Sequence, residues 1–488
     1  MVIESLKYKI LQQFGFAPTQ EQGQALDTFV SFLTDRDPQA VMILRGSAGT
    51  GKTSLSGAIV RTLLQIRQKV MLLAPTGRAA KVFSLGSGAP AYTIHRRIYR
   101  EKAFAGVDGQ FSLNDNLYTD TLFMVDEASM IANMGLGGTT FGSGCLLDDL
   151  VKFVYQGHND RLLLIGDKAQ LPPVGEEDSP ALSASVMEGY GLKVFECDLN
   201  EVLRQSQSSG ILYNATLIRQ MITHDAVTGL PLIRFKGFAD IVMMPGAELV
   251  ESLGDSYHHV GMDETMVITR SNKRANIYNN GIRNMVLDRE EELSSGDMLM
   301  IVKNNYFWTE KEKKESGEGS AGAVPTFLAN GDRAKVLRVS NYIELYGFRF
   351  ATLLLQLPDY DDYEMQVTGM LDTLQSEAPA LTHEQQEELF RQVEEDYQHF
   401  VPLKADRMKS IRQDAYFNAL QIKYAYAVTC HKAQGGQWAH VYVDQGYMTD
   451  DMLTPDYIHW LYTAFTRATD KLFLVNWPKE QTCEPTDL

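Results

Sequence analysis

The chain has 488 residues, of which 44% are hydrophobic and 22% charged. This composition is ordinary for a globular protein, and no stretch approaches the roughly 20 consecutive apolar residues that a membrane-spanning helix needs. We therefore expect about three or four structural units and no membrane contact. The first nine residues lack the apolar core of a secretion signal. The four cysteines lie far apart without a CxxC pair, which argues against a zinc site or disulfides and is typical of a reducing cytoplasm.

The formal net charge is −17, and a uniformly acidic protein repels nucleic acid. Any surface for nucleic acid must therefore be a local basic track. Two clusters are candidates, and solvated surface remains the alternative for each: Arg78, Lys81, Arg96, Arg97, Arg100 and Lys102 in the first, and Arg270, Lys273, Arg274 and Arg283 in the second.

Short apolar runs indicate buried strands in two sets. Continuous runs of this kind are typical of parallel sheets that helices cover on both faces. Two α/β units of similar kind are the simplest interpretation. The first set comprises residues 41–44, 70–73, 122–125 and 162–165, and the second comprises residues 266–269, 441–443 and 472–475.

The sequence pattern changes between residues 295 and 415. Residues 311–322 are charged and then rich in Gly and Ser, which predicts a mobile loop, and residues 331–357 alternate like antiparallel strands. Residues 382–400 predict an amphipathic helix that begins with a capping box of Thr382 and Gln385. Its apolar stripe comprises Leu389, Val393, Tyr397 and Phe400. We expect an inserted small β-barrel with a helical extension.

The segment from residue 46 to residue 53 matches the phosphate-binding pattern GxxxxGK[ST] between a predicted strand and a predicted helix. Backbone N–H groups and a helix N-terminus bind phosphate oxygens in such a loop. Lys52 would place a cation on the β- and γ-phosphates, and the Thr53 hydroxyl would reach Mg²⁺. The residues expected to bind ATP here are Gly46, Ser47, Ala48, Gly49, Thr50, Gly51, Lys52 and Thr53.

Polar residues follow the third and fourth predicted strands. Asp126 is expected to hold Mg²⁺ and Glu127 to polarise the attacking water, because hydrolysis needs a metal and a positioned base. An acidic pair at this place can also be a helix cap. Gln170, within GDKAQLPP, is expected to sense the γ-phosphate, and a polar exit from the strand is the alternative.

In this order and spacing, GSAGTGKT, VDEAS and GDKAQLPPV resemble motifs I, II and III of superfamily 1 helicases. PTGRAAK and TIH resemble motif Ia and the element after it, and their forms, with YTAFTRA, point to the 5′-to-3′ branch of RecD-like and Dda-like helicases. The sequence departs from the family at Pro18, where Leu is usual, and in the long glycine-rich link 131–150. The other resembling segments are TQEQ at 19–22 (Q-motif), LRQ at 203–205 (motif IV), VTCHKAQG at 428–435 (motif V) and YTAFTRA at 462–468 (motif VI).

The resemblance implies roles for further residues. Arg204 and Arg467 would be arginine fingers that reach the γ-phosphate from the second α/β unit, with surface salt bridges as the alternative. Gln22 would read adenine, and Gly435 would contact the nucleotide. The residues implied to contact single-stranded nucleic acid are Thr76, Gly77, Arg78, Thr93, His95 and His431.

The resemblance also implies an α/β fold of two RecA-like P-loop domains with an inserted SH3-like β-barrel and a hairpin or helical accessory element. The expected boundaries are 1–200 for the first RecA-like domain, 201–294 with 416–488 for the second, and 295–415 for the barrel and its extension. Within the first domain, residues 84–118 would include a strand-splitting hairpin with Phe104 and Phe111, or an ordinary surface hairpin. Residues 382–400 would form a tower or pack on their own domain.

From these observations we expect an ATP- and Mg²⁺-dependent 5′-to-3′ DNA helicase that translocates on single-stranded DNA. A second hypothesis is a nucleic-acid-stimulated ATPase that serves as a structural or motor subunit of a nuclease or repair complex. The expected partners are single-stranded and forked DNA, with RNA left open, and repair or replication proteins. We expect a monomer in the cytoplasm without a membrane partner.

Overall fold

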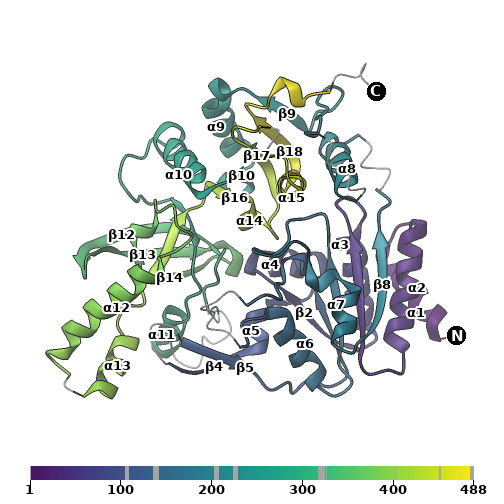
Figure 1. Ribbon diagram of the computed structural model, residues 1–488, viewed down its shortest axis with the longest axis horizontal. Helices are drawn as coiled ribbons and strands as arrows, with labels where there is room; N and C mark the ends of the chain where they lie inside the picture. The colour runs from purple at the N-terminus through teal and green to yellow at the C-terminus, as the bar shows by residue number, and fades with distance from the viewer. Residues whose placement is uncertain are drawn as a thin grey trace. The chain divides into compact units, whose positions relative to one another are not determined.

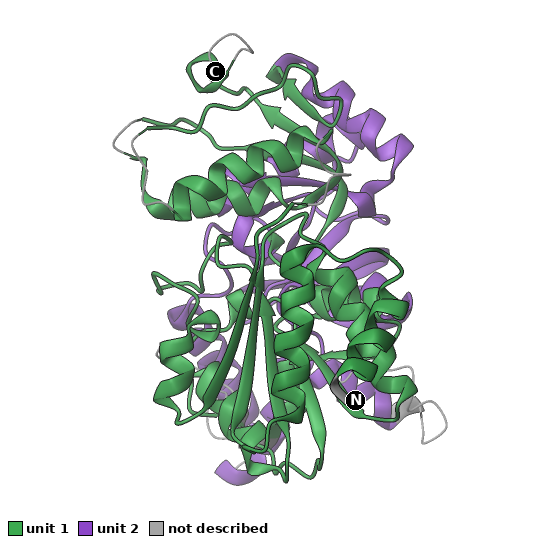
Figure 2. Ribbon diagram, turned by 90° about the vertical axis from the view of Figure 1, so that its right-hand side faces the viewer, with its two compact units in different colours: residues 1–246, 433–488 green, residues 247–432 purple. Residues whose placement is uncertain are grey.

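The computed structural model describes residues 2–104, 109–135, 142–202, 208–223, 229–316, 325, 327–401, 403–449 and 452–483. The chain forms two compact units, residues 1–246 with 433–488, and residues 247–432 (Figure 2). The fold is α/β with parallel sheets and a closed barrel, as the sequence predicts. No helix within the described ranges is long and apolar enough to cross a membrane.

The first unit is built on a six-stranded parallel sheet in the order β3-β2-β6-β7-β1-β8. The four predicted strands are present as β1, β2, β6 and β7, whereas the sequence pattern did not reveal β3 and β8. β8 alternates between exposed and half-buried side chains, so it lacks a continuous apolar run. The strands are β1 (Ala40–Gly46), β2 (Lys69–Ala74), β3 (Ala91–Thr93), β6 (Thr121–Val125), β7 (Arg161–Gly166) and β8 (Lys193–Leu199).

Helices cover both faces of this sheet (Figure 1). Met42 and Leu44 of β1 pack into a core with the first three helices, and Val41 and Ile43 pack into a second core on the opposite face. Alternate side chains of a strand point to opposite faces, so burial on both faces explains the unbroken apolar run. The helices are α1 (Val2–Phe14), α2 (Gln20–Thr34), α3 (Lys52–Gln65), α4 (Gly77–Ser87), α5 (Ile94–Ile98), α6 (Leu146–Gln156) and α7 (Ala184–Gly189).

The hairpin predicted after residue 98 is present. β4 (Tyr99–Phe104) pairs antiparallel with β5 (Gly109–Leu113). Its tip, residues 105–108, lies outside the described residues.

The second set of parallel strands is divided between the two units. In the first unit, β17 (Trp438–Asp444), β18 (Ala468–Val475) and β9 (Ile241–Met244) are parallel neighbours in that order. α8 (Gly210–Thr223) and α15 (Pro455–Phe465) belong to the same unit. In the second unit, β10 (Thr265–Thr269) pairs parallel with β16 (Ala427–Thr429), and the chain also forms α9 (Leu249–His259), α10 (Asn272–Gly281) and α14 (Cys430–Ala433).

The predicted barrel is closed and lies in the second unit. Its last strand lies past residue 415, so the barrel extends beyond the expected limit of the insert, and the three-domain division stays a proposal. The strands are β11 (Met298–Ile301), β12 (Arg333–Leu345), β13 (Phe348–Leu357), β14 (Tyr363–Met370) and β15 (Leu420–Tyr424).

Asp297, directly before β11, is a fully buried carboxylate that joins the barrel to the segment preceding it. Arg283 donates two hydrogen bonds of 3.1 Å to Asp297, and Arg289 donates one of 2.7 Å. The Tyr426 hydroxyl and the backbone N–H of Ser294 donate further bonds. Because Arg283 is buried in this ion pair, it cannot belong to the basic track in which the sequence analysis placed it.

The expected loop at 311–322 is helical in its first part. α11 (Phe307–Ser316) covers residues 311–316, while residues 317–322 lie outside the described residues. Trp308 is buried at the start of the helix, and its indole N–H donates to the carbonyl of Asn418. This contact fixes the first turn of the helix. The following residues are mostly Glu and Lys, which are good helix formers.

The helical extension consists of α12 (His383–Gln398) and α13 (Lys404–Arg412). Thr382 and Gln385 form the predicted capping box. Leu389 and Val393 pack with Phe350 and Ile411 in a core, so the helix is held on its own domain, and its role as a tower stays a prediction. Phe400 was expected on the same stripe, but the helix ends at Gln398 and the ring is 78% exposed.

This packing predicts that Leu389→Ala destabilises the second unit by about 2–5 kcal/mol, because it leaves a cavity in a filled core. Phe400→Ser is the matched control and should change stability by less than about 0.5 kcal/mol. Urea unfolding, with hydrogen exchange of peptides from 345–424, measures both. Equal effects of the two substitutions would contradict the assigned core.

Candidate active site

The P-loop joins the end of β1 to α3, which begins at Lys52. Gly49 and Gly51 have φ angles of 78° and 76°, the left-handed region that suits glycine. A Cβ on Gly49 would lie 3.2 Å from the Leu212 side chain. The Thr50 hydroxyl donates 2.8 Å to the carbonyl of Ser47 and closes the loop. The sequence folds locally into an anion cradle at a helix N-terminus.

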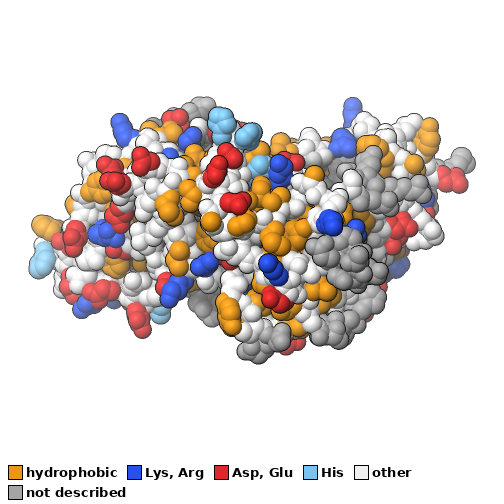
Figure 3. All heavy atoms as spheres, turned by 90° about the horizontal axis from the view of Figure 1, so that it is seen from above, with side chains coloured by type: hydrophobic (Ala, Val, Ile, Leu, Met, Phe, Trp, Pro, Cys, Tyr) orange, Lys and Arg blue, Asp and Glu red, His pale blue; other side chains and the backbone are white. Residues whose placement is uncertain are grey.

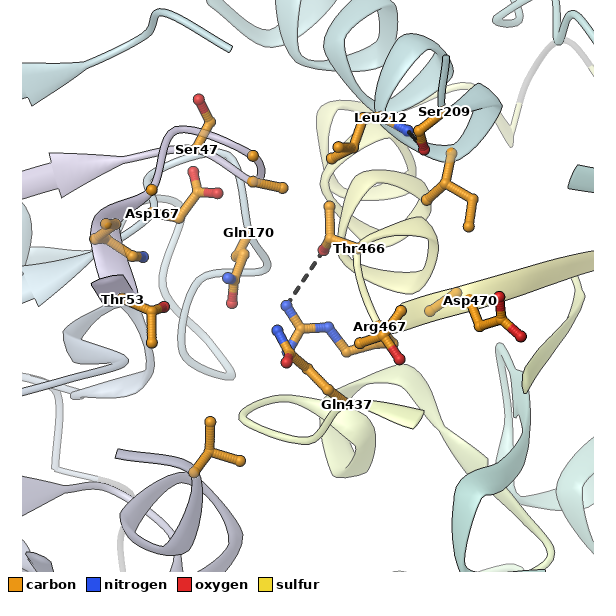
Figure 4. A pocket seen from close by; sticks show the side chains of 18 of the residues that line it. Ser47, Thr53, Asp167, Gln170, Ser209, Leu212, Gln437, Thr466, Arg467 and Asp470 are labelled. Atoms are coloured by element: carbon orange, nitrogen blue, oxygen red, sulfur yellow. Dashed lines mark hydrogen bonds between the residues drawn. The ribbon is translucent and has the colours of Figure 1, made fainter. Parts of the chain in front are cut away.

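The P-loop borders a cavity of about 730 Å³ within the first unit (Figure 4). One wall holds the P-loop with Asp126, Glu127, Asp167 and Gln170, from the carboxyl ends of β6 and β7. The facing wall comes from the start of α8 and the residues just before it, from the residues before β9, from residues 435–437 and from residues 466–470. The described residues of that wall include Ser209, Leu212, Asp240, Gly435, Gln437, Thr466, Arg467 and Asp470.

The acidic pair after β6 occupies an unfavourable electrostatic and backbone environment. Desolvation raises the pKa of Asp126 to about 6, against the opposing charge of Lys52, and the charge of Glu127 raises it further. Glu127 itself has φ 53°, a left-handed conformation that is uncommon for a residue with a side chain. Its N–H donates 2.9 Å to the Asp126 carboxylate. Strained backbone of this kind is concentrated at functional sites.

Gln170 connects Glu127 to Arg467. When the amide is oriented so that each of its atoms meets a partner, its N–H donates to a Glu127 carboxylate oxygen at 3.2 Å and its oxygen accepts from Arg467 Nη2 at 3.2 Å. The Arg467 Nη1 lies 4.0 Å from the other oxygen of Glu127. The predicted water-activating carboxylate, γ-phosphate sensor and one arginine finger therefore lie together on the cavity.

Arg467 is buried and held in place by hydrogen bonds to its own segment and to Gly436. Its guanidinium donates to the carbonyls of Thr463 and Gly436, both at 3.1 Å. It also donates to the Thr466 hydroxyl at 3.2 Å (Figure 4). The cation points toward Gln170, so a surface salt bridge does not explain it. The other expected finger, Arg204, lies outside the described residues.

Two residues that the sequence reasoning missed hold the P-loop. The Tyr462 hydroxyl donates 2.6 Å to the buried Asp167 and accepts from the Ala48 N–H at 3.0 Å. Arg219 of α8 donates to the Ser47 hydroxyl. Tyr462 stands inside the YTAFTRA segment, which was a signal that could have revealed it, whereas nothing in the sequence around Arg219 marks it.

Gln22 lies beneath the P-loop with 1% of its surface exposed. Its amide oxygen accepts from the N–H of Thr19, and its amide nitrogen donates 2.8 Å to the carbonyl of Thr50. In this position Gln22 supports the P-loop. The adenine contact that the resemblance implies stays a prediction.

The start of motif Ia lies beside Gly435, the last residue of motif V, at the beginning of α4. Thr76 caps the helix, which begins at Gly77, and a Cβ on Gly435 would lie 3.2 Å from the Thr76 hydroxyl and 2.9 Å from the Ala79 side chain. Arg78 donates 2.9 Å to the carbonyl of Gln437 and stacks over Trp438 at 5.6 Å. Gly435 therefore both lines the cavity at the P-loop and approaches the segment expected to bind nucleic acid.

The remaining expected nucleic-acid contacts have different surroundings. Thr93 caps α5 through the N–H of Arg96, and desolvation lowers the pKa of His95 to about 4, so His95 is a neutral donor or acceptor at pH 7. His431 belongs to the second unit and is exposed. On the face in Figure 3, basic side chains are interspersed with acidic and apolar ones. The nucleic-acid track stays a prediction.

Phe111 of the hairpin packs partly buried against the core beside α6. Removing this ring would therefore disturb the packing of the first domain as well as any strand-splitting action of the hairpin. The side chain of Phe104 lies outside the described residues. The role of the hairpin in separating strands stays a prediction, and it concerns the tip of the hairpin.

The polar groups of the cavity suit Mg²⁺ bound together with a nucleotide. Mg²⁺ takes one or two protein oxygens and completes its shell with phosphates and water. The Thr53 hydroxyl faces the cavity and Asp126 offers a desolvated carboxylate. No group of three or more His, Cys, Asp or Glu in the described part of the chain could hold a metal alone.

Two family models match the chain. Residues 17–229 match the AAA domain family, and residues 424–475 match the UvrD-like helicase C-terminal domain. The first covers the P-loop, the acidic pair and Gln170, and the second covers Gly435 and Arg467.

Curated relatives match the chain over segments or over most of its length. The ATP-dependent RecD2 DNA helicase of Deinococcus radiodurans is 30% identical over 157 residues, which are 32% of this chain and 18% of that protein. An uncharacterised protein of Methanocaldococcus jannaschii is 33% identical over 32% of this chain and 13% of its own length. An uncharacterised protein of Acanthamoeba polyphaga mimivirus is 21% identical over 90% of this chain and 96% of its own length.

Among solved structures, the Pif1 helicase from Bacteroides with ADP-AlF3 and single-stranded DNA is 13% identical. It covers 96% of this chain and 95% of its own, with a TM-score of 0.45. Pif1 helicase from Candida albicans is 16% identical over 96% and 98% of the two chains, with a TM-score of 0.38.

The raised pKa of Asp126 predicts a pH-dependent gain in stability for Asp126→Asn. A carboxyl whose folded-state pKa is raised contributes stability at low pH, and this contribution is lost as the pH rises through about 6. Without nucleotide and metal, the substitution should therefore raise the unfolding temperature at pH 7.5 and raise it less at pH 5. Thermal unfolding at both pH values measures this. An equal gain at both pH values would contradict the assigned desolvation.

Proposed function

We propose that this chain, which belongs to superfamily 1 of the helicases, is an ATP-dependent 5′-to-3′ DNA helicase. Its cofactors would be ATP and Mg²⁺, and its substrates would be single-stranded and forked DNA. The observation that carries the proposal is the single cavity in which a P-loop, an acidic pair, Gln170 and a buried arginine face one another. These are the parts that phosphoryl transfer to water requires.

Each group has a task set by its place. The P-loop N–H groups and Lys52 neutralise the β- and γ-phosphates, and Glu127 accepts the proton of the attacking water. Arg467, held by three hydrogen bonds, supplies positive charge to the γ-phosphate during transfer. Mg²⁺ held by Thr53 and Asp126 would neutralise phosphate charge. We assign Arg204 the role of a second finger.

The hydrolysis site is joined to the proposed DNA track by short connections. Arg467 donates to the carbonyl of Gly436, and the neighbouring Gly435 packs on the N-terminus of α4. A change at the γ-phosphate would therefore reach the motif Ia segment through Gly436 and its neighbour Gly435, the last residue of motif V. Coupling of this kind, between hydrolysis and grip on the strand, is what translocation needs.

The proposed direction of translocation, the DNA substrate and the cellular setting are inferred from the relatives and from the chain's own motifs. The RecD2 relative is named as a DNA helicase, and the PTGRAAK, TIH and YTAFTRA forms support the 5′-to-3′ direction. We propose that the protein acts as a monomer, alone or with repair or replication proteins. The four cysteines lie far apart in the sequence without a CxxC pair, which supports a cytoplasmic location.

Glu127→Gln should bind Mg·ATP normally and lose turnover by about 10²–10⁴-fold, because the attacking water loses its base. Nucleotide titration and ATPase assays with single-stranded DNA measure the two effects separately. Glu188→Gln, an identical change at an exposed position of α7, is the control and should behave as the unmodified protein. Normal turnover of Glu127→Gln would remove Glu127 from the mechanism.

Unwinding assays on tailed duplexes test the function and its direction. A duplex with a 5′ single-stranded tail should be separated with ATP, whereas blunt and 3′-tailed duplexes should stay intact. Binding should weaken steeply with salt, because the strand is held by its phosphates. Unwinding from the 3′ tail would reverse the direction. ATP hydrolysis stimulated by DNA without unwinding of any duplex would favour an ATPase subunit of a larger complex.

A further inference from the structure

α15 presents one polar face to the loop that follows β7. His459, Tyr462 and Thr463 are three and four residues apart, so they share one side of the helix. Tyr462 binds Asp167 at the start of this loop. Thr463 Oγ1 accepts from the N–H of Leu171 at 2.8 Å. The helix therefore binds the loop that carries Gln170 both at Asp167 and at Leu171.

His459 binds the backbone of this loop next to Gln170. Its Nδ1 lies 2.9 Å from the carbonyl oxygen of Ala169 and 3.1 Å from that of Gln170. Carbonyl oxygens only accept hydrogen bonds, so Nδ1 must carry the proton and donate to both. One side chain thus holds two consecutive carbonyls.

The residue after Gln170 is held from two sides. In addition to the bond from its N–H to Thr463, the carbonyl of Leu171 accepts from Gln434 Nε2 at 2.7 Å. The backbone at residues 169–171 is therefore fixed by three side chains, all of which come from residues 434–463. On the other side of this backbone, the Gln170 side chain spans Glu127 and Arg467.

We propose that His459 is a positioning residue that sets the orientation of Gln170, and that it thereby couples the place of α15 to the hydrolysis step. When α15 lies against the loop, the imidazole holds the two carbonyls and the Gln170 amide reaches both Glu127 and Arg467. When α15 withdraws, the loop loses these bonds and the contact opens. The inference rests on the proposed ATP-driven function of the same site and assigns a role to a residue outside its motifs.

Substitutions at His459 separate positioning from nucleotide binding. His459→Asp replaces the donor with a carboxylate that faces two carbonyls, and it should lower kcat by about tenfold or more. Nucleotide affinity should stay within about twofold, because the P-loop contacts remain. His459→Asn places a carboxamide N–H near the position of Nδ1 and should restore most of kcat. His258→Asp, the same change at an exposed histidine of α9, is the control and should leave kcat unaltered.

A double-mutant cycle with Gln170→Ala tests whether His459 acts through Gln170. If it does, His459→Asp should add little to the loss that Gln170→Ala causes alone. Additive losses, or a His459→Asn variant as slow as His459→Asp, would overturn the proposal. A fall of the unfolding temperature in proportion to the loss of kcat across the variants would also overturn it, because the role would then be structural. The comparison uses ATP hydrolysis with and without single-stranded DNA.

Failure of DNA to stimulate hydrolysis by the unmodified protein would count against the proposed function. The double-mutant cycle on unstimulated hydrolysis would still decide the role of His459.

Discussion

Two carboxylates withdrawn from water beside Lys52 are the constraint on which the first unit depends. Desolvation raises the pKa of both Asp126 and Asp167, and Lys52 opposes the shift at each. Charges in such a place are costly unless they are paired and hydrogen-bonded. Tyr462 supplies a hydrogen bond to Asp167, so part of the compensation comes from α15. The hydrogen bond from Tyr462 thus offsets part of the desolvation cost at Asp167, and a bound cation would compensate the charge of Asp126.

The sequence predicted the parts whose physical cause is local. All seven apolar runs are strands, because a run buried on both faces of a sheet must be continuously apolar. The P-loop and the capping box at Thr382 are also local, since each is defined by neighbours within eight residues. The placing of Lys52, Asp126, Glu127 and Gln170 is not local, but it was predictable because the carboxyl ends of parallel strands meet at one edge.

The features that the sequence did not predict depend on partners far along the chain. β8 is recognisable only by its pairing with β1, and α11 depends on a tryptophan anchored near residue 418. Arg283 resembles any surface arginine until Asp297 is placed beside it. Tyr462, Arg219 and His459 bind residues more than 170 positions away. Such contacts leave no periodicity in the sequence.

The way in which the barrel closes has a consequence for the evolution of the chain. Leu299 on the first barrel strand pairs directly with Tyr424 on the last. The two ends of the barrel segment therefore lie side by side. Everything between β11 and β15 forms an excursion whose ends are fixed to each other by strand pairing. Segments with neighbouring ends are those that proteins gain, lengthen and exchange most readily. The helices α12 and α13 are carried on this excursion, so they can diverge between relatives without any shift of the strands that carry the P-loop cavity.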